Sequence, residues 1–340
     1  MLNRINALYD FIASFLILLL CFTFLSACDL FNDESGFEQE PGPILFISDE
    51  SGTEQLYSLA PDGTDVRQLT SDPGFPITDA VWSPDGSRIV LVSSVGGDRT
   101  YGPALYIVNA DGTGRRKLFR GGNSPNSASG QHPVWSPDGR QLVFQRLLVP
   151  EALGIYAVFM VNVDGTGLKS FGDVKEDFPR VVTDWSQDGA TLLGHTIDPT
   201  ARDSAGRATV YDYVTTWNVA GDSLFAFGGE IGEGYTWPVW SSSNQAIALR
   251  ILRDRTFELY RASATGTDLV QLTNDEFDFI IPVAWSPDDK HILAKGTIRN
   301  QNRRFRDHIV MVDASRNEVL DLSPFSEEFH NRPTSWLAIE

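Results

Sequence analysis

A tryptophan followed by a short polar turn recurs along the chain at intervals of about fifty residues. The six tryptophans are Trp82, Trp135, Trp185, Trp240, Trp285 and Trp336. Repetition at a fixed period means that one unit of several secondary-structure elements is used repeatedly. We therefore expect six related units, in which these tryptophans have a structural role.

Each unit contains the pattern of four antiparallel strands. Residues 83–86 and 136–139 both read Ser-Pro-Asp-Gly, in which proline presets φ at the second position and glycine accepts the left-handed fourth. In later units Asn244 and Asp289 take the place of that glycine. Two alternating apolar runs follow each turn, and a hairpin turn such as residues 111–114 leads to a last short strand.

These units resemble the WxPDG β-propeller repeats of TolB and of the propeller domains of prolyl-oligopeptidase-type peptidases. The resemblance covers nearly all of the chain after its first 43 residues. It implies sheets, or blades, arranged radially around a central channel. The expected fold is all-β: a six-bladed β-propeller of four-stranded antiparallel blades over residues 44–340, with the fourth and fifth blades the most irregular.

The two ends of the propeller sequence complement each other. The first unit begins at residues 44–47 and has no tryptophan strand, whereas residues 333–338 form such a strand with no unit after it. One strand from the end and three from the beginning would complete one blade. We expect this C-terminal strand to close the ring without leaving an open sheet edge at the seam.

The N-terminal segment is typical of an exported protein. An apolar run at residues 11–25 follows Arg4, and it is shorter than the roughly 20 residues that a spanning helix needs. Residues 25–28 (Leu-Ser-Ala-Cys) resemble the lipobox of bacterial lipoproteins, which implies a signal peptide over residues 1–27 and a lipid on Cys28. The acidic residues 28–43 would be a flexible tether. An ordinary signal peptide or an uncleaved anchor remains the alternative.

Charge and cysteine content restrict the partners. The formal net charge is −18, which disfavours nucleic acid and anionic lipid headgroups. Of the two cysteines, Cys21 lies in the signal segment and Cys28 would carry lipid. We expect a monomer that contacts a bacterial membrane only through its lipid and faces the periplasm or the cell surface, with the choice between inner and outer membrane left open.

One face of the propeller carries the long connections, namely those between strands 2 and 3 and those between blades. Long loops on a rigid scaffold are where recognition usually occurs. We expect a protein or peptide partner to bind there, at the channel mouth. The candidate binding residues are Asp79, His132, Arg180, Tyr235, Trp237, Asp278, His330 and Arg332.

Charges in these connections suggest an acidic funnel inside a basic rim, suited to a cationic segment of a partner or to a cation. The acidic residues between blades are Asp173, Glu176, Asp177, Glu230, Glu233, Asp275, Glu276, Asp278, Glu327 and Glu328. The arginines between strands 2 and 3 are Arg99, Arg202, Arg207, Arg253, Arg255, Arg299, Arg303, Arg304 and Arg306. Charged surface loops without a ligand are the alternative.

Catalytic motifs are not found in the sequence. It has no G-x-S-x-G elbow, no H-E-x-x-H and no phosphate-binding glycine loop, so we expect a non-enzymatic protein without cofactor or metal. TolB also has an N-terminal α/β domain, for which residues 28–43 leave no room. The alternatives are an accessory subunit of a peptidase and a glycan-binding or glycan-cleaving propeller. In the second case His132 and His330 would hold a metal at the channel mouth, since oligogalacturonate lyases build a metal site from several histidines around such a channel.

Overall fold

The computed structural model describes residues 42–98, 102–118, 131–149, 155–172, 179–209, 211–299, 304–326 and 328–338. The chain divides into two units, residues 1–40 and 41–340. The predicted signal peptide, Cys28 and nearly all of the tether lie outside the described residues, so these predictions remain predictions. Within the described part, no helix has the length and apolar character needed to cross a membrane.

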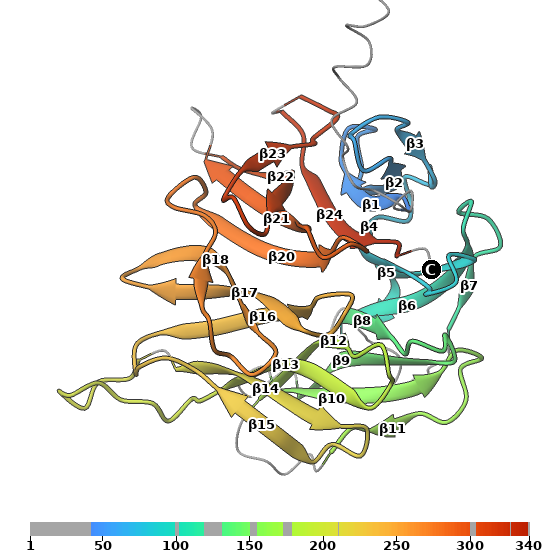
Figure 1. Ribbon diagram of the computed structural model, residues 1–340. Helices are drawn as coiled ribbons and strands as arrows, with labels where there is room; N and C mark the ends of the chain where they lie inside the picture. The colour runs from blue at the N-terminus through green and yellow to red at the C-terminus, as the bar shows by residue number, and fades with distance from the viewer. Residues whose placement is uncertain are drawn as a thin grey trace, which may run out of the picture. The chain divides into compact units, whose positions relative to one another are not determined.

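The second unit is an all-β propeller (Figure 1). Its first blade contains β24 (Asn331–Trp336), β1 (Ile44–Ser48), β2 (Gln55–Leu59) and β3 (Arg67–Gln68). The second contains β4 (Ile77–Trp82), β5 (Arg88–Asp98), β6 (Gly102–Asn109) and β7 (Arg116–Lys117). The third contains β8 (Gln131–Trp135), β9 (Gln141–Val149), β10 (Ile155–Asn162) and β11 (Lys169–Ser170). A further blade contains β20 (Phe279–Trp285), β21 (His291–Arg299), β22 (Phe305–Asp313) and β23 (Val319–Asp321).

The remaining strands form one continuous sheet of eight. Its first half contains β12 (Arg180–Trp185), β13 (Thr191–Ile197), β14 (Asp212–Asn218) and β15 (Ser223–Phe227). Its second half contains β16 (Gly234–Trp240), β17 (Ala246–Arg253), β18 (Thr256–Ser263) and β19 (Val270–Gln271). The two halves are joined where β14 meets β16 in a parallel bridge between Asp212 and Gly234.

The prediction of six four-stranded blades is therefore wrong. Four blades have four strands, and the other two units are merged into a single sheet. The physical reason is local, because the repeat pattern describes strands and turns within a unit and carries no signal for a backbone bridge between units. Gly234, without a side chain, is suited to the close backbone approach that the bridge requires. The merged units are the two that were expected to be the most irregular.

The expected pairing of the chain's two ends is present. β24 runs antiparallel to β1, with Trp336 opposite Ile44 and Asn331 opposite Ser48. Figure 1 shows β24 in red beside β1 in blue. The C-terminal strand thus completes the first blade, as the sequence predicts.

The core lies between neighbouring sheets. One cluster combines Leu45 and Leu56 of the first blade with Trp82, Ile89 and Leu91 of the second, and all five are buried. The motif turns adopt the expected backbone, with Gly86 at φ 65° and Asn244 and Asp289 each at φ 58°.

Indole N–H groups of the motif tryptophans connect these layers by hydrogen bonds to backbone carbonyls. Trp82 donates to Pro43, Trp135 to Val81 and Trp285 to Val239, over 3.1–3.3 Å. Trp336 instead donates at 3.0 Å to Gly42, just before β1 of its own blade. The indole N–H groups of Trp185 and Trp240 have no such acceptor among the described residues. The strands β12 and β16, which carry these two tryptophans, therefore lack this hydrogen bond to a neighbouring strand.

Candidate functional site

A cavity of about 870 Å³ is lined by the innermost strands β4, β8, β12, β16, β20 and β24. Close to the beginnings of these strands its wall carries Asp79, His132, Trp237 and Arg332, together with Lys295 of β21. We call these five residues the channel mouth. Concave sites that combine apolar surface with a few convergent polar groups are the usual places for ligands.

Every innermost strand has a β-bulge or irregularity beside the cavity. The register shifts lie at Ile77/Asp79, Gln131/Val134, Val182/Asp184, Thr236/Val239, Pro282/Ala284 and, in β24, Pro333/Ser335. A bulge turns a side chain away from the regular alternation of a strand. The propeller therefore aims selected side chains at the channel.

Two of these bulges hold large side chains in a strained backbone conformation. His132 has φ 52° and Trp237 has φ 55°, in the left-handed region that costs an ordinary residue about 1–2 kcal/mol. The two rings meet edge to face, with their centroids 4.9 Å apart. Strain of this kind is retained where the surrounding structure enforces it, often at binding sites.

His195 fixes the backbone at Trp237. Its side chain is buried, and its Nδ1 accepts a hydrogen bond from the Trp237 N–H at 3.3 Å. Burial lowers the pKa of His195 to about 3, and the charge of Arg250 acts in the same direction. The ring is therefore neutral at physiological pH, as an acceptor must be. His195 did not enter the predicted site, because a histidine inside an apolar strand gives no functional signal.

The charged residues of the channel mouth are closely spaced. The Asp79 carboxylate accepts a hydrogen bond from the Ala80 N–H at 2.9 Å and lies 3.6 Å from Nδ1 of His132. Burial raises the pKa of Asp79, whereas the charges of His132 and Arg332 lower it. Arg332 donates to the carbonyl of Thr78 at 3.1 Å. The mouth therefore presents both signs of charge.

Asp184 is a wall residue that the sequence reasoning missed. Its carboxylate accepts hydrogen bonds from the backbone N–H groups of Trp185 and Trp240, each at 2.7 Å. It thereby connects β12 to β16, across the seam where the indole N–H of Trp240 has no acceptor. The position before a motif tryptophan is Val81 or Val134 in earlier units, so an aspartate there was the available signal.

Asp184 should make stability depend on pH. Burial raises the pKa of Asp184 from 3.8 to about 7, so the folded protein binds its proton more tightly than the unfolded chain. Stability from this group is complete below pH 4 and is lost as the pH rises through 7. In Asp184→Asn, the free energy of unfolding should fall by roughly 2 kcal/mol less between pH 5 and 8 than in the original protein. One pKa unit corresponds to about 1.4 kcal/mol, and the partial solvent access through the channel reduces the effect.

Urea unfolding at a series of pH values measures this effect. Asp138→Asn is the matched control, because Asp138 lies on an exposed motif turn and hydrogen bonds lower its pKa. The control should keep the slope of the original protein between pH 5 and 8. An unchanged slope in Asp184→Asn would contradict the assignment.

Four of the eight predicted binding residues do not line the cavity. Arg180 lies over the Trp217 ring at 5.5 Å, and Tyr235 is buried in the core. Asp278 is exposed and accepts a hydrogen bond from the Arg299 N–H at 2.7 Å. His330 lies 3.5 Å from the Asp307 carboxylate. The remaining four, Asp79, His132, Trp237 and Arg332, come together at the channel mouth.

The predicted acidic funnel has no counterpart in the described part of the wall. Of the predicted acids, Asp173, Glu176, Asp177 and Glu327 lie outside the described residues, as do Arg99 and Arg303 of the rim. The other predicted acids do not line the cavity. Instead the wall carries Asp79, Asp85 and Asp184 together with Lys295 and Arg332. No three His, Cys, Asp or Glu side chains of the described residues are grouped so that they could hold a metal ion.

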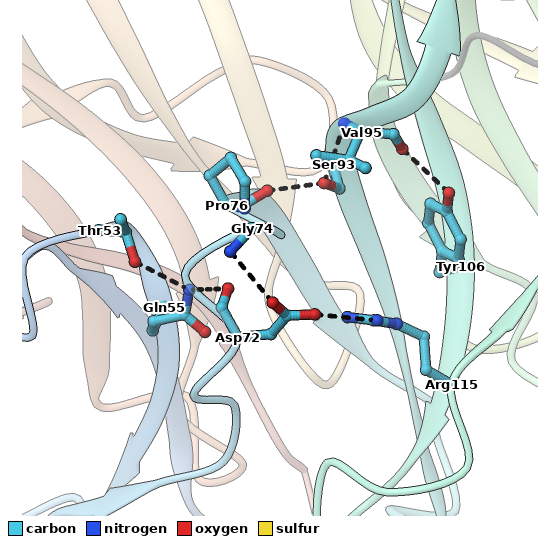
Figure 2. A network of polar contacts seen from close by, with 9 residues as sticks. All are labelled: Thr53, Gln55, Asp72, Gly74, Pro76, Ser93, Val95, Tyr106 and Arg115. Atoms are coloured by element: carbon cyan, nitrogen blue, oxygen red, sulfur yellow. Dashed lines mark hydrogen bonds and ion pairs between the residues drawn. The ribbon is translucent and has the colours of Figure 1, made fainter.

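Polar contacts hold the connection that leads into β4 (Figure 2). Gln55 Nε2 donates to the Asp72 carbonyl at 2.9 Å, and the Asp72 carboxylate pairs with Arg115 at 3.1 Å. Ser93 Oγ donates to the Pro76 carbonyl at 2.7 Å. These bonds tie the first blade to the second and fix where β4 begins, and so where Asp79 lies.

Comparisons with known proteins agree with this architecture. No protein family model matches the chain. A stretch of 88 residues is 34% identical to the Tol-Pal system protein TolB of Geobacter sulfurreducens, covering 26% of this chain and 18% of that protein. The repeats are TolB-like. The chain also matches the uncharacterized peptidase YuxL of Bacillus subtilis, with 28% identity over 129 residues, 30% of this chain and 20% of that protein.

A solved structure extends the likeness to the fold. TolB from Acinetobacter baumannii superimposes with a TM-score of 0.60 at 19% identity, over 87% of this chain and 66% of that chain. The TolB-like β-propeller is therefore common to both proteins. The matched part of this chain spans about a fifth of the length of the curated relatives.

Proposed function

We propose that the chain is a non-enzymatic binding protein of the bacterial cell envelope, anchored by a lipid on Cys28, which receives a protein or peptide partner at the channel mouth. The observation that carries the proposal is the pair of strained aromatic residues, His132 and Trp237, held edge to face at a cavity of about 870 Å³. A rigid, prearranged aromatic surface favours binding because little entropy is lost on contact.

The likeness to TolB supports this proposal, since the relative's name places it in the Tol-Pal system. The peptidase relative suggests enzymatic activity as the alternative, but we propose only a binding role for the channel. Residues 11–28 support export and lipid attachment.

Site-specific photo-crosslinking in the native host tests the proposal. Benzoylphenylalanine at position 237 should yield a defined adduct with one protein. The same group at Leu224, which is 56% exposed on β15, should not yield it. Equal labelling from both positions, or none from either, would argue against binding at the channel mouth.

Cys28→Ser should move the protein out of the membrane fraction if the anchor is correct.

A further inference from the structure

Acidic groups around the channel mouth already have partners. Asp79 is engaged by the Ala80 N–H and lies beside His132. Asp307 accepts a hydrogen bond from the Thr297 hydroxyl at 2.7 Å and lies near His330. Glu54 lies 3.5 Å from Arg332. Each of these carboxylates therefore already faces a donor from the described chain.

Two cationic residues of the mouth retain donors. Lys295 lines the cavity and forms no hydrogen bond or ion pair with the residues that the structure describes, although its ammonium group has three donors. The Nε–H of Arg332 is buried and likewise has no acceptor in the described part of the chain. An unsatisfied buried donor is costly, so the Arg332 guanidinium is short of an acceptor, and the half-buried Lys295 ammonium beside the same cavity keeps donors for a ligand.

Burial and the neighbouring positive charges determine which ligand charge Lys295 can accept. Burial lowers the pKa of Lys295, and the charges of Arg332 and Arg250 lower it further, against the attraction of Asp307 and Asp79. A singly charged acceptor would relieve this repulsion. A dianion would meet Asp79 on the same wall, which favours a monoanion.

We propose that Lys295 and Arg332 bind a carboxylate that the peptide partner inserts into the channel mouth. This inference rests on the proposed function and names the chemistry of the ligand. The carboxylate accepts hydrogen bonds from Nζ of Lys295 and from the guanidinium group of Arg332, since a carboxylate can accept from two donors at once. The rings of His132 and Trp237 contact the adjoining part of the peptide. The carboxylate can come from an Asp or Glu side chain or from a chain terminus.

Three pools of randomised hexapeptides separate these sources. The first pool has no Asp or Glu and ends in an amide, the second has no Asp or Glu and a free C-terminal carboxylate, and the third contains Asp and Glu and ends in an amide. Each pool is passed over the immobilised full chain, and the retained fraction is measured. We expect retention of the second or third pool to exceed that of the first at least tenfold.

Substitutions test whether Lys295 and Arg332 are responsible for the retention of peptides. Lys295→Met and Arg332→Gln should each reduce retention of the preferred pool about tenfold, because each removes a charge-assisted hydrogen bond. Arg316→Gln, an exposed arginine on the turn before β23, is the control and should change nothing. Thermal unfolding of each variant verifies that the propeller is intact.

The outcomes separate the carboxylate site from peptide binding as such. Equal retention of all pools that is lost on Trp237→Ala would overturn the carboxylate site and leave the proposed function standing. Failure to retain any pool would also overturn it, and the crosslinking experiment would then decide the proposed function. Retention unaffected by both cation variants would exclude Lys295 and Arg332 as the binding groups.

Discussion

Replacing Trp336 by alanine is expected to lower the free energy of unfolding by about 4 kcal/mol, as is typical for a large buried aromatic side chain. Trp336 is 6% exposed and packs with Ile44, Phe46 and Leu293. Its indole N–H donates to the Gly42 carbonyl at 3.0 Å. The substitution leaves a cavity at the place where the two ends of the propeller meet.

Chemical denaturation measures the loss, and Trp336→Phe is the matched control. Phenylalanine retains most of the buried apolar surface and removes the hydrogen bond, so a loss of about 1–2 kcal/mol is expected. If both variants unfold at the same denaturant concentration as the original protein, the C-terminal strand does not support the first blade.

Gly112→Ala is expected to destabilise the propeller by about 3 kcal/mol or more. Gly112 has φ 81°, and a Cβ atom at this position would lie 1.9 Å from the carbonyl oxygen of Leu69. The backbone strain of alanine at positive φ therefore adds to a clash with backbone of the neighbouring blade. The turn after β6 must move away from the first blade to relieve it.

Gly52→Ala provides the comparison. Gly52 also has positive φ, at 92°, but a Cβ atom there would meet nothing within 4 Å. Only the backbone strain remains, so we expect a loss of about 1 kcal/mol. Thermal melting of both variants gives the difference, and equal losses would show that contact with Leu69 contributes nothing.

The strands and turns could be predicted from the sequence because their signals are local. The turn conformations were predicted from Ser-Pro-Asp-Gly sequences such as residues 83–86. The pairing of β24 with β1 was predicted from the unpaired runs at residues 44–47 and 333–338. The bridge from Asp212 to Gly234 carries no such signal, since any two backbones that approach closely can form it.

The site was only partly predictable for a related reason. His132 and Trp237 precede motif tryptophans by three residues, and that position indicates the channel. Tyr235 lies two residues earlier on the same strand, yet packs in the core, because the bulge between Thr236 and Val239 shifts the alternation of side chains. Lys295 lies on the second strand of its unit, where the sequence pattern predicts no access to the channel.

The pairing of β24 with β1 has a consequence for how the protein is made. Residues 44–48 are synthesised early, but their neighbour in the sheet emerges only after residue 336. Until then, the main-chain groups along that side of β1 have no strand beside them, which is a template for association with another chain. Contacts between residues so distant in sequence also form slowly. A partner that shields this edge until β24 has paired would increase the yield of native protein without altering its final stability.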